Sequence, residues 1–498
     1  VPGIHRLRLV TSSRQGPDRV ISLSDLHVRG LPGDGIVHVD GDDPRFFSVN
    51  GRFVWPLGHS LHSNYDTRSV QVLHSKLTVN RGQFTRQALL ERLVAHGGTG
   101  CEIWLSAWNL GLEWIPTWPG YHGPGNYHDG HAWEIDRFLD AAERLGVRAN
   151  VSIYNHGMAR GGGGAEEEWR FHPFNVVNGG WLDQPSGLFT DDRAFAYQQR
   201  MFRYLAARYG DSPALLGWKL WAEVNLVQAP VPAVEDWHRR ASEALHKVDP
   251  YQHPVTTHWC GDWHNANRTI TSLPTVNYVT IDAYHGVTAS VANVLNNSTH
   301  NPLAPKSGLA DIGKPIVVTE FGGNWDACAE PRLIAEHAIG PWVGLVSGHA
   351  ASPMLWWFEW IDQGERYGVY RALSRFIAGE DLRGKTAQCV APTVTAGKTA
   401  LWCRAWRNDQ RWLGYIVDLA WSMAGGSAAS WDGCTLMLEA DVAPGTLLIE
   451  WWNADNGNIV TTAKLVHSGG KPAFAVPPFA GHLAFKVRPV TPTPTTDR

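Results

Sequence analysis

The sequence of 498 residues predicts an α/β protein, a (β/α)8 TIM barrel followed by a small all-β sandwich domain. Between residues 50 and 380, short apolar runs typical of buried strands alternate with amphipathic helical patterns. That alternation is typical of parallel strands joined by helices. After residue 384 the pattern changes to short strands separated by Gly, Asn and Asp, which favours an antiparallel domain.

Residues 1–44 alternate only loosely between apolar and polar side chains and predict an N-terminal β segment. This segment either ends an upstream domain or packs beside the barrel. Next, Asn50-Gly51 lies between two strand-like runs, which is a strong signal for a β-hairpin. The chain begins with Val1-Pro2-Gly3 and without Met, so we expect a processed or trimmed form.

The barrel is expected over residues 45–384. Buried strands are predicted at residues 54–60, 101–105, 147–154, 214–223, 254–259, 276–284, 315–320 and 352–358. Helices are predicted near residues 85–96, 131–145, 190–209, 233–248, 331–347 and 368–378, with Thr190 as the N-cap of the third. Eight strands with intervening helices match the count of such a barrel, which places its active site at the carboxyl ends of the strands.

The remaining chain predicts two further parts. Residues 385–490 carry short strands with turn residues between them and predict the β-sandwich. Residues 491–498 are rich in Thr and Pro and predict a flexible tail. Three of the six cysteines (389, 403 and 434) lie in this last quarter, where the sequence leaves their pairing open.

Composition restricts the class of function. A formal net charge of −4 and a pI of about 6.7 give no indication of electrostatic binding to nucleic acid. No apolar run reaches about 18 residues, so no membrane span is expected. The cysteines lack the spacing of a zinc site, and the glycine run at 161–164 lacks the motif of a phosphate loop, so neither a metal nor a cofactor is expected. The 25 Trp residues favour flat platforms on which sugar rings stack, and filling the interior of a large barrel is an equally good interpretation of any single Trp.

Two glutamates end buried strands in the same manner. Glu223 follows the apolar run at residues 216–222, and Glu320 ends the run at residues 315–320. By strand count they belong to the fourth and seventh strands, so both face the same mouth of a barrel. Two carboxylates on either side of a glycosidic bond are the minimal machinery of glycoside hydrolysis.

Other polar and aromatic residues lie at presumed strand ends and in long loops. Trp108 belongs to an aromatic loop after the second strand, His156 follows the third strand, and His258 lies at the end of the fifth. We expect all three to contact a carbohydrate substrate, and weaker candidates of the same kind are His59 and Asn155. A structural role is an equally good interpretation of each histidine and of Asn155.

The strand-end motifs resemble clan A of the glycoside hydrolases, close to family 5. The resemblance covers about residues 45–380 and is carried by Trp218-Lys219-Leu220-Trp221-Ala222-Glu223, Tyr284, Val318-Thr319-Glu320-Phe321-Gly322 and Trp356-Trp357, with further likeness at residues 103–114 and 197–210. Residues 450–457 are similar to β-sandwiches appended to such enzymes.

This resemblance implies a retaining mechanism on β-glycosidic bonds of a polysaccharide or oligosaccharide. Glu223 is the implied acid/base and Glu320 the implied nucleophile, with Tyr284 touching the nucleophile. Trp356 or Trp357 is implied to stack under the reacting sugar. We expect a secreted protein, extracellular or periplasmic.

Two positions depart from the family pattern. By resemblance, Ala222 stands where the family has an Asn that holds the sugar 2-hydroxyl, and Glu102 stands where the family has an Arg that steadies the nucleophile. A negative charge beside Glu320 raises the pKa of that carboxyl instead of lowering it. These departures motivate an alternative, a catalytically weak or inactive carbohydrate-binding or surface-structural protein on a glycosidase scaffold. The sugar, the linkage, endo or exo action and the oligomeric state stay open.

Overall fold

The computed structural model describes residues 3–6, 8–13, 16–23, 25–28, 35–106, 109–163, 166–261, 263–300, 307–409 and 411–490. The chain divides into two compact units, Val1–Gly35 and Ile36–Arg498. In the first unit, β1 (Gly3–His5) pairs antiparallel with β4 (Leu26–Val28), and β2 (Arg8–Ser13) pairs with β3 (Gly16–Ser22). This unit is therefore built of short strands, and it ends at residue 35, whereas the sequence suggested a boundary at residue 44.

The second unit begins with a small antiparallel sheet. Its strands are β5 (Val37–Val39), β6 (Phe47–Val49) and β7 (Arg52–Val54). Asn50 and Gly51 join the last two strands with φ angles of 52° and 75°. A two-residue hairpin turn that matches the strand twist needs positive φ at both positions, and Asn-Gly supplies them at low cost. The predicted hairpin is present.

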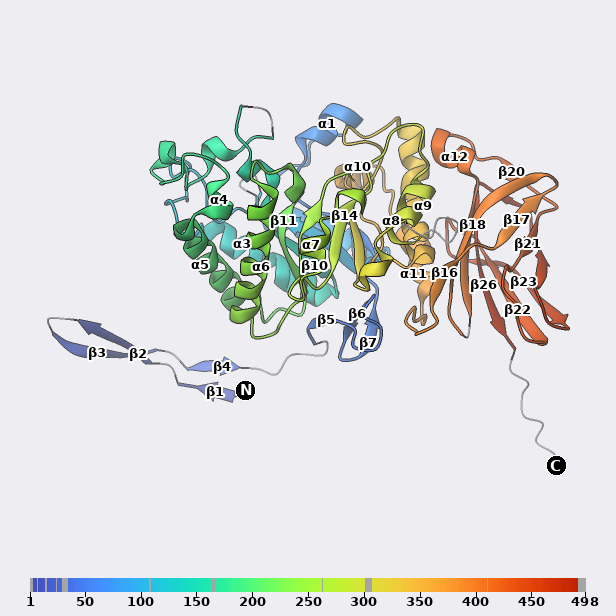
Figure 1. Cartoon of the computed structure of the whole chain (residues 1–498), viewed down its shortest axis with the longest axis horizontal. Helices are drawn as coiled ribbons and strands as arrows, with labels where there is room; N and C mark the ends of the chain where they lie inside the picture. Colours follow the sequence, from blue (N-terminus) through green and yellow to red (C-terminus); the bar gives the residue numbers. More distant parts are fainter. Residues whose placement is uncertain are drawn as a thin grey trace. The chain divides into compact units, whose positions relative to one another are not determined.

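Parallel strands follow in two groups (Figure 1). The first sheet has the order β12-β11-β10-β9-β8 and the second β13-β14-β15. Their bounds are β8 (Gly58–Ser60), β9 (Gly100–Trp104), β10 (Arg148–Asn155), β11 (Leu215–Ala222), β12 (Val255–Thr256), β13 (His258–Trp259), β14 (Val279–Asp282) and β15 (Ile316–Glu320). Each neighbouring pair is parallel, so the carboxyl ends within each sheet lie at one edge.

Backbone and side-chain hydrogen bonds connect the two sheets. The segment expected as the eighth strand is extended but not a regular strand. Its Met354 O accepts from Phe321 N at 3.2 Å, and its Leu355 O accepts from Ser60 N at 3.1 Å. On the other side, Thr257 Oγ1 donates to Trp221 O at 3.3 Å. The segment therefore joins β15 to β8, and Thr257 interrupts what the sequence predicted as one strand at 254–259.

The sequence of strand β11 fits its buried position in the sheet. All eight of its residues are buried, as a continuous apolar run predicts for a strand covered on both faces. A Cβ atom at Gly217 would lie 2.6 Å from Pro254 O and 2.7 Å from Tyr278 Oη. Glycine at this position therefore permits the close approach of the neighbouring chain.

Helices lie between and beyond the parallel strands. Their bounds are α1 (Thr67–Leu73), α2 (Gln83–Ala95), α3 (Asp129–Leu145), α4 (Gly187–Thr190), α5 (Asp192–Tyr209), α6 (Val231–Val248), α7 (Arg268–Thr271), α8 (Val291–Thr299), α9 (Glu330–Ser347), α10 (Phe358–Gln363) and α11 (Gly368–Ile377). The predicted cap of α5 is wrong by one residue, because Asp191 and not Thr190 accepts the hydrogen bond from Ala194 N. None of the described helices is both long and apolar enough to cross a membrane.

The C-terminal part is antiparallel. Its main sheet has the order β23-β22-β26-β19-β18-β17-β21-β24, and β16 also pairs with β18. The elements are β16 (Gln388–Val390), β17 (Thr393–Ala396), β18 (Thr399–Arg407), β19 (Trp412–Val417), α12 (Leu419–Ala424), β20 (Ser430–Trp431), β21 (Thr435–Met437), β22 (Gly445–Trp452), β23 (Ile459–His467), β24 (Ala473–Ala475), β25 (Phe479–Ala480) and β26 (His482–Pro489). Val394, Leu436 and Phe474 share one core with Ile449 and Phe485 from the other half of the sheet.

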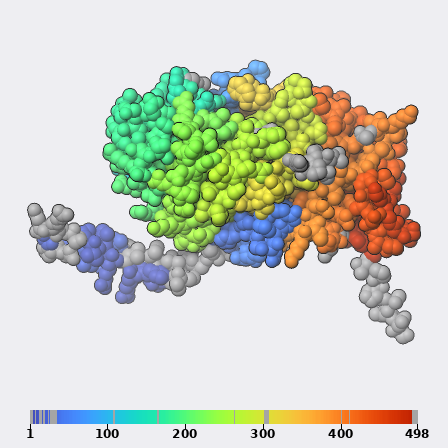
Figure 2. Space-filling view, in the orientation of Figure 1, coloured from blue at the N-terminus to red at the C-terminus, as the bar shows by residue number. Residues whose placement is uncertain are grey.

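This sheet packs against the helices of the parallel region, and the two meet along a continuous surface in Figure 2. Trp342 of α9 stacks on Tyr415 of β19 with ring centres 5.6 Å apart, and Phe376 of α11 meets Trp452 of β22 edge to face. Aromatic pairs of this kind stabilise an interface beyond the area that they bury. All six cysteines are free thiols, so no disulfide links the C-terminal strands.

Candidate active site

A cavity of about 430 Å³ opens at the carboxyl ends of the parallel strands. Glu223, directly after β11, and Glu320, the last residue of β15, both line it. The rest of the wall includes His156, Tyr284, Trp104 and Trp356. Two carboxylates with aromatic surfaces around them are suited to a sugar ring and its glycosidic bond.

Glu223 is held in an unusual backbone conformation. Its φ of 53° and ψ of 48° lie in the left-handed region, which a residue other than Gly adopts only when its surroundings impose it. The backbone N–H of Glu223 donates to His258 Nδ1 at 3.1 Å. On the side chain, Oε2 lies 2.9 Å from His156 Nδ1. The turn after β11 therefore presents the carboxyl to the cavity and against a histidine.

Glu320 is almost fully buried. Tyr284 donates its hydroxyl to Oε2 at 3.3 Å, so the tyrosine touches this glutamate. His258 Nδ1 lies 3.8 Å from Oε1. The carboxyl of Glu320 thus accepts one hydrogen bond and lies near the His258 ring, which also accepts the backbone N–H of Glu223.

A buried ion pair lies behind the two glutamates. Lys219 Nζ donates to Glu102 Oε1 at 2.6 Å and to Thr319 Oγ1 at 3.1 Å, and neither charged side chain has exposed surface. Glu102 also accepts from Trp104 Nε1 at 2.7 Å and from Asn150 Nδ2 at 2.7 Å. The carboxylate at the position of the family's Arg is therefore neutralised by a lysine of β11.

A third carboxylate, Asp282 at the end of β14, joins the site. It is fully buried, and its Oδ1 lies 2.6 Å from His258 Nε2. Because His258 Nδ1 accepts the N–H of Glu223, the neutral ring carries its proton on Nε2, facing Asp282. Oxygens of Asp282 lie within 4.8 Å of ligand atoms of both Glu223 and Glu320.

The pKa values of these groups diverge. Burial and the charge of Glu223 raise the pKa of Glu320 well above its ordinary value, with Lys219 acting in the opposite direction. Burial and the charges of Glu320 and Glu223 likewise raise the pKa of Asp282. For Glu223, burial is outweighed by the hydrogen bond and charge of His156, which lower its pKa. Hydrogen bonds to Glu166 and Glu223 overcome burial and raise the pKa of His156 to about 9.

The residues expected to bind substrate divide into two groups. His156, Tyr284 and Trp356 line the cavity. Two others do not, because Trp357 is fully buried with its Nε1 donating to Gly322 O at 2.8 Å, and His258 is fully buried between the carboxylates. Contrary to the expectation of a substrate contact, the side chains of Trp357 and His258 lie outside the cavity wall. Trp108 lies outside the described residues.

The weaker candidates also divide. His59 is wrong as a substrate contact, because it is fully buried and stacks on Tyr370 with ring centres 5.5 Å apart. Asn155 lines the cavity, and the register of β10 and β11 sets it beside Ala222. Its Nδ2 donates to Ser106 Oγ at 2.9 Å. Its Oδ1 accepts from Met158 N at 3.3 Å, so the amide that lies one strand away from Ala222 is hydrogen-bonded through both its nitrogen and its oxygen.

Sequence reasoning missed Lys219 and Asp282 as members of the site. A signal existed for each. Lys219 is a lone cation inside an otherwise apolar strand, where an unpaired charge is too costly to bury. Asp282 ends a buried strand as both glutamates do.

The cavity mouth carries a charged cluster from helix α1 and from two loops. Arg68 of α1 lies 3.2 Å from Glu166 and 2.6 Å from Asp326, and its guanidinium lies 4.3 Å from the ring centre of Trp325. Glu166 Oε2 is in turn 3.6 Å from His156 Nε2. A chain of charges therefore links the mouth to Glu223.

Comparisons with known proteins give the fold a context. No protein-family model matches the chain. Mannan endo-1,4-β-mannosidase F of Aspergillus clavatus is 24% identical over 131 residues, and the protein of the same name from Aspergillus fumigatus is 23% identical over 131 residues. Each match covers 25% of this chain, with 26% and 25% of the respective relatives. The chain therefore matches only about a quarter of the length of these relatives.

Solved structures match over nearly the whole chain. One glycoside hydrolase superposes with a TM-score of 0.57 at 11% identity, covering 91% of this chain and 97% of the other. A glycoside hydrolase of family 5 from Bacteroides vulgatus has a TM-score of 0.55 at 10% identity, covering 91% and 94%. The chain therefore shares its fold with glycoside hydrolases and resembles family 5 of clan A, as the strand-end motifs predicted.

Proposed function

We propose that this protein is a retaining glycoside hydrolase that cleaves β-glycosidic bonds of a polysaccharide. The observation that carries the proposal is that Glu223 and Glu320 end two parallel strands and line one cavity with aromatic walls. We also propose that the two parallel sheets and the segment at 352–358 form a (β/α)8 barrel, residues 45–384, and that residues 385–490 form a β-sandwich. A polymeric substrate implies a secreted protein, extracellular or periplasmic.

In the first step, the carboxylate of Glu320 attacks the anomeric carbon and forms an ester with it. The bond to the leaving sugar breaks, and the carboxylic acid of Glu223 gives its proton to the leaving oxygen. In the second step, water attacks the ester and Glu223, now a carboxylate, takes the proton of that water. Glu320 leaves as a carboxylate, so both residues return to their starting states.

In the ligand-free site, the protonation of the two glutamates differs from that which the proposed reaction needs. The directions of the pKa shifts favour the ionised form of Glu223 beside His156 and the protonated forms of Glu320 and Asp282. Catalysis needs the other arrangement, with Glu223 protonated and Glu320 ionised. We infer that substrate binding moves a proton towards Glu223, and that Asp282, which approaches both glutamates, passes it on by way of water.

The substrate class follows from the walls and the relatives. Trp356 stacks on His62 with ring centres 3.5 Å apart and an angle of 5°, which holds the indole in one orientation at the cavity wall. Such a fixed ring suits stacking under a pyranose. Because the curated relatives are named mannan endo-1,4-β-mannosidases, β-1,4-mannan is the first polysaccharide to test.

The experiment is a panel of defined β-glycans with Glu320→Ala as the control, followed by a 2-fluoro mannoside with a good leaving group. The proposal expects soluble sugar release by the wild type and none by Glu320→Ala. It also expects the 2-fluoro sugar on Glu320 in peptide mass spectra. Labelling of another residue would refute the assigned roles.

A second candidate, a carbohydrate-binding protein with little chemistry, is favoured by Ala222 and by the resting protonation of the two glutamates. It expects polysaccharide binding that Glu223→Gln leaves unchanged, with no labelling and no sugar release. The same panel therefore separates the two candidates.

A further inference from the structure

One side of the cavity mouth is closed by side chains from three places in the chain. Arg68 of α1 reaches Glu166, in the loop after β10, and Asp326, in the loop after β15, and its guanidinium lies over the ring of Trp325. We call these four residues the mouth bridge. Arg68, Glu166 and Trp325 line the cavity directly. The proposed reaction gives none of the four a role in the chemistry.

The mouth bridge joins loops from opposite sides of the parallel strands. In the proposed barrel, which counts β12 and β13 as one strand, β10 is third and β15 is seventh in the order of eight. Their carboxyl ends therefore face each other across the mouth. Helix α1, which follows β8, supplies the arginine that connects them. The bridge thus encloses the part of the mouth above β8, β9 and the segment at 352–358.

Both ends of the mouth bridge are held by further contacts. At one end, Arg160 Nη1 and His156 Nε2 each lie 3.6 Å from Glu166 Oε2. At the other end, two backbone hydrogen bonds between Asn324 and Ala327, of 3.0 and 2.8 Å, close the turn that carries the bridge. A single ion pair near the surface contributes little, but a network of several charges holds its geometry better. The mouth bridge is therefore a fixed part of the cavity wall.

The enclosed side of the mouth is where the reacting sugar would lie. Trp356 forms the wall there, with His62 stacked on it and Trp104 meeting it edge to face. A pyranose on Trp356 would have its anomeric carbon on the side of Glu320, the proposed nucleophile. The proposed acid, Glu223, protonates the oxygen of the leaving sugar. The leaving sugar therefore lies on the side of β11, away from the mouth bridge.

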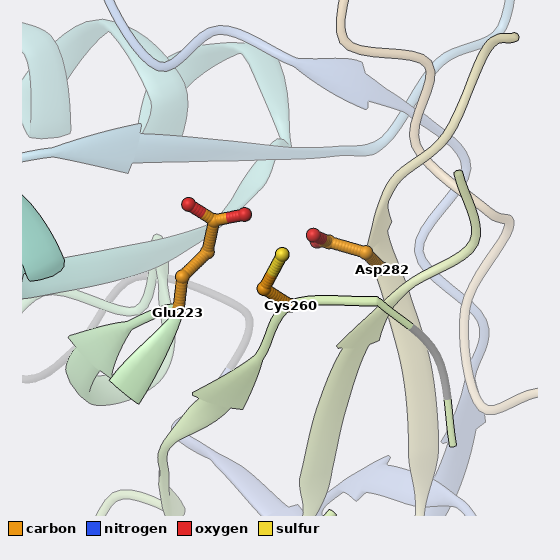
Figure 3. Close-up of side chains that lie close together, drawn as sticks. All are labelled: Glu223, Cys260 and Asp282. Atoms are coloured by element: carbon orange, nitrogen blue, oxygen red, sulfur yellow. The ribbon is translucent and has the colours of Figure 1, made fainter. Parts of the chain in front are cut away.

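The side from β11 to β14 lacks a comparable wall. Of the residues that the structure describes between 224 and 283, none lines the cavity. Figure 3 shows the side chains of Glu223, Cys260 and Asp282 pointing towards one another, and of these three only Glu223 lines the cavity. Hydrogen bonds of 2.8 and 3.1 Å between Cys260 and Asn225 hold the loop after β13 against the turn after β11. A long leaving group therefore has its way out on this side.

We propose that the mouth bridge makes the enzyme exo-acting, so that it removes a short terminal unit from the non-reducing end of its substrate. A cavity of about 430 Å³ is near the lower end of the range for small-molecule sites, about 300–1,000 Å³, and takes roughly one or two sugar units. A chain that continued past these units would collide with the bridge. The inference rests on the proposed glycosidase and adds the chain end from which it works.

The binding test compares three forms of β-1,4-mannohexaose by calorimetry, on full-length Glu223→Gln, which lacks the acid proton. A fluorescent tag at the reducing end should change Kd by less than about twofold relative to the plain sugar. A benzylidene cap on the non-reducing end should weaken binding at least about tenfold, because it clashes with the mouth bridge.

A second substitution in the same background tests the bridge itself. Arg68→Ala should recover most of the affinity for the capped sugar. Arg208→Ala is the matched control, since Arg208 is similarly exposed, 34% against 29%, and pairs with Asp136 at 2.7 Å outside the cavity wall. This control should bind the capped sugar as poorly as its parent does. Circular dichroism establishes that each variant folds.

Equal affinities for the plain and capped sugars would overturn the inference, as would a discrimination that Arg68→Ala leaves unchanged. With the wild-type enzyme, the tagged hexaose should shorten stepwise, and Arg68→Ala should add internal cleavage. If the glycan panel identifies another polymer, its hexamer replaces mannohexaose.

The inference and the proposed function can fail separately. Discrimination against the cap without sugar release would refute only the proposed function. Sugar release that gives tagged fragments of every length from the first time point would refute only the exo mode. Absence of both binding and release with every glycan of the panel would refute both.

Discussion

The ion pair between Lys219 and Glu102 offers the sharpest test of how the site is held together. The perturbation is Lys219→Met, which keeps the length and apolar stem of the side chain and removes its charge. Glu102 then stays buried with Trp104 Nε1 and Asn150 Nδ2 as donors but without a counter-charge. The substitution therefore isolates the value of one positive charge beneath the two glutamates.

The magnitude follows from the geometry. At the separation of 2.6 Å, with an effective dielectric constant of about 20, the attraction between two unit charges is about 6 kcal/mol. Part of that is lost to relaxation, and removal of one partner from a buried pair typically destabilises by about 3–5 kcal/mol. A native protein is stable by about 5–15 kcal/mol in total. Lys219→Met should therefore lose a large share of the free energy of unfolding.

The assay is urea unfolding followed by Trp fluorescence, with two companion variants. Lys471→Met breaks a surface pair with Glu439 of similar length, 2.8 Å, but with partly exposed side chains, and should change the free energy of unfolding far less than Lys219→Met does. Lys219→Met with Glu102→Gln removes both charges and should recover most of the loss, because a neutral buried pair leaves no uncompensated charge. A cost for Lys219→Met as small as that for Lys471→Met, or a double variant as unstable as the single one, would refute this reasoning.

Further predictions concern the groups around Glu223. The pKa of His156 is raised from an ordinary 6.5 to about 9, so its contribution to stability is complete below about pH 6.5 and disappears as the pH rises through about 9. In unfolding experiments at different pH values, His156→Gln should therefore remove a decline in stability of up to about 3 kcal/mol over that range. An unchanged decline would contradict this assignment. Asn155→Ala should lower kcat/KM by about 10- to 100-fold on a β-glycan, because a contact of Asn155 with the sugar 2-hydroxyl would strengthen in the transition state by several kcal/mol. The effect should be much smaller on a substrate without the 2-hydroxyl. Equal losses on both substrates would argue against this contact. Asp282→Asn should reduce kcat more than KM in steady-state kinetics, and an unchanged kcat would exclude the proton relay. Arg68→Ala should raise KM and leave kcat within about twofold, because Arg68 touches only groups at the mouth; a selective loss of kcat would show that the charge chain to His156 matters more.

The order of elements could be predicted because each depends on local pattern. Apolar runs bounded by glycine gave the strands of the parallel region, and Asn50-Gly51 fixed a hairpin through the φ angles that this pair tolerates. The two glutamates could be found because both end such runs. The eighth strand and the cap of α5 were less well predicted, since strand regularity depends on neighbours and a cap can move by one residue between Thr190 and Asp191.

Burial could not be predicted for the aromatic and histidine candidates. Trp356 and Trp357 are adjacent in sequence, yet one lines the cavity and the other donates its indole N–H to Gly322 O in the interior. His59 lies in the middle of β8 and His258 begins β13, and both side chains are buried in the interior. Which side of a strand end faces the cavity depends on the twist and closure of the sheet, which a local pattern does not contain.

Register between parallel strands places an amide and a cation close to the two positions that depart from the family pattern. Asn155 of β10 pairs with Ala222 of β11, so the amide absent on one strand is present at the same level on the next. Likewise, the cation absent at Glu102 of β9 is supplied by Lys219 of β11, whose side chain crosses to it at 2.6 Å. In a closed parallel sheet, side chains from several strands share one layer, so a functional group can move between strands while its place in the layer is kept. When two sequences are compared position by position, a functional group that has moved to a neighbouring strand is counted as lost. The register of the strands shows where that group now lies.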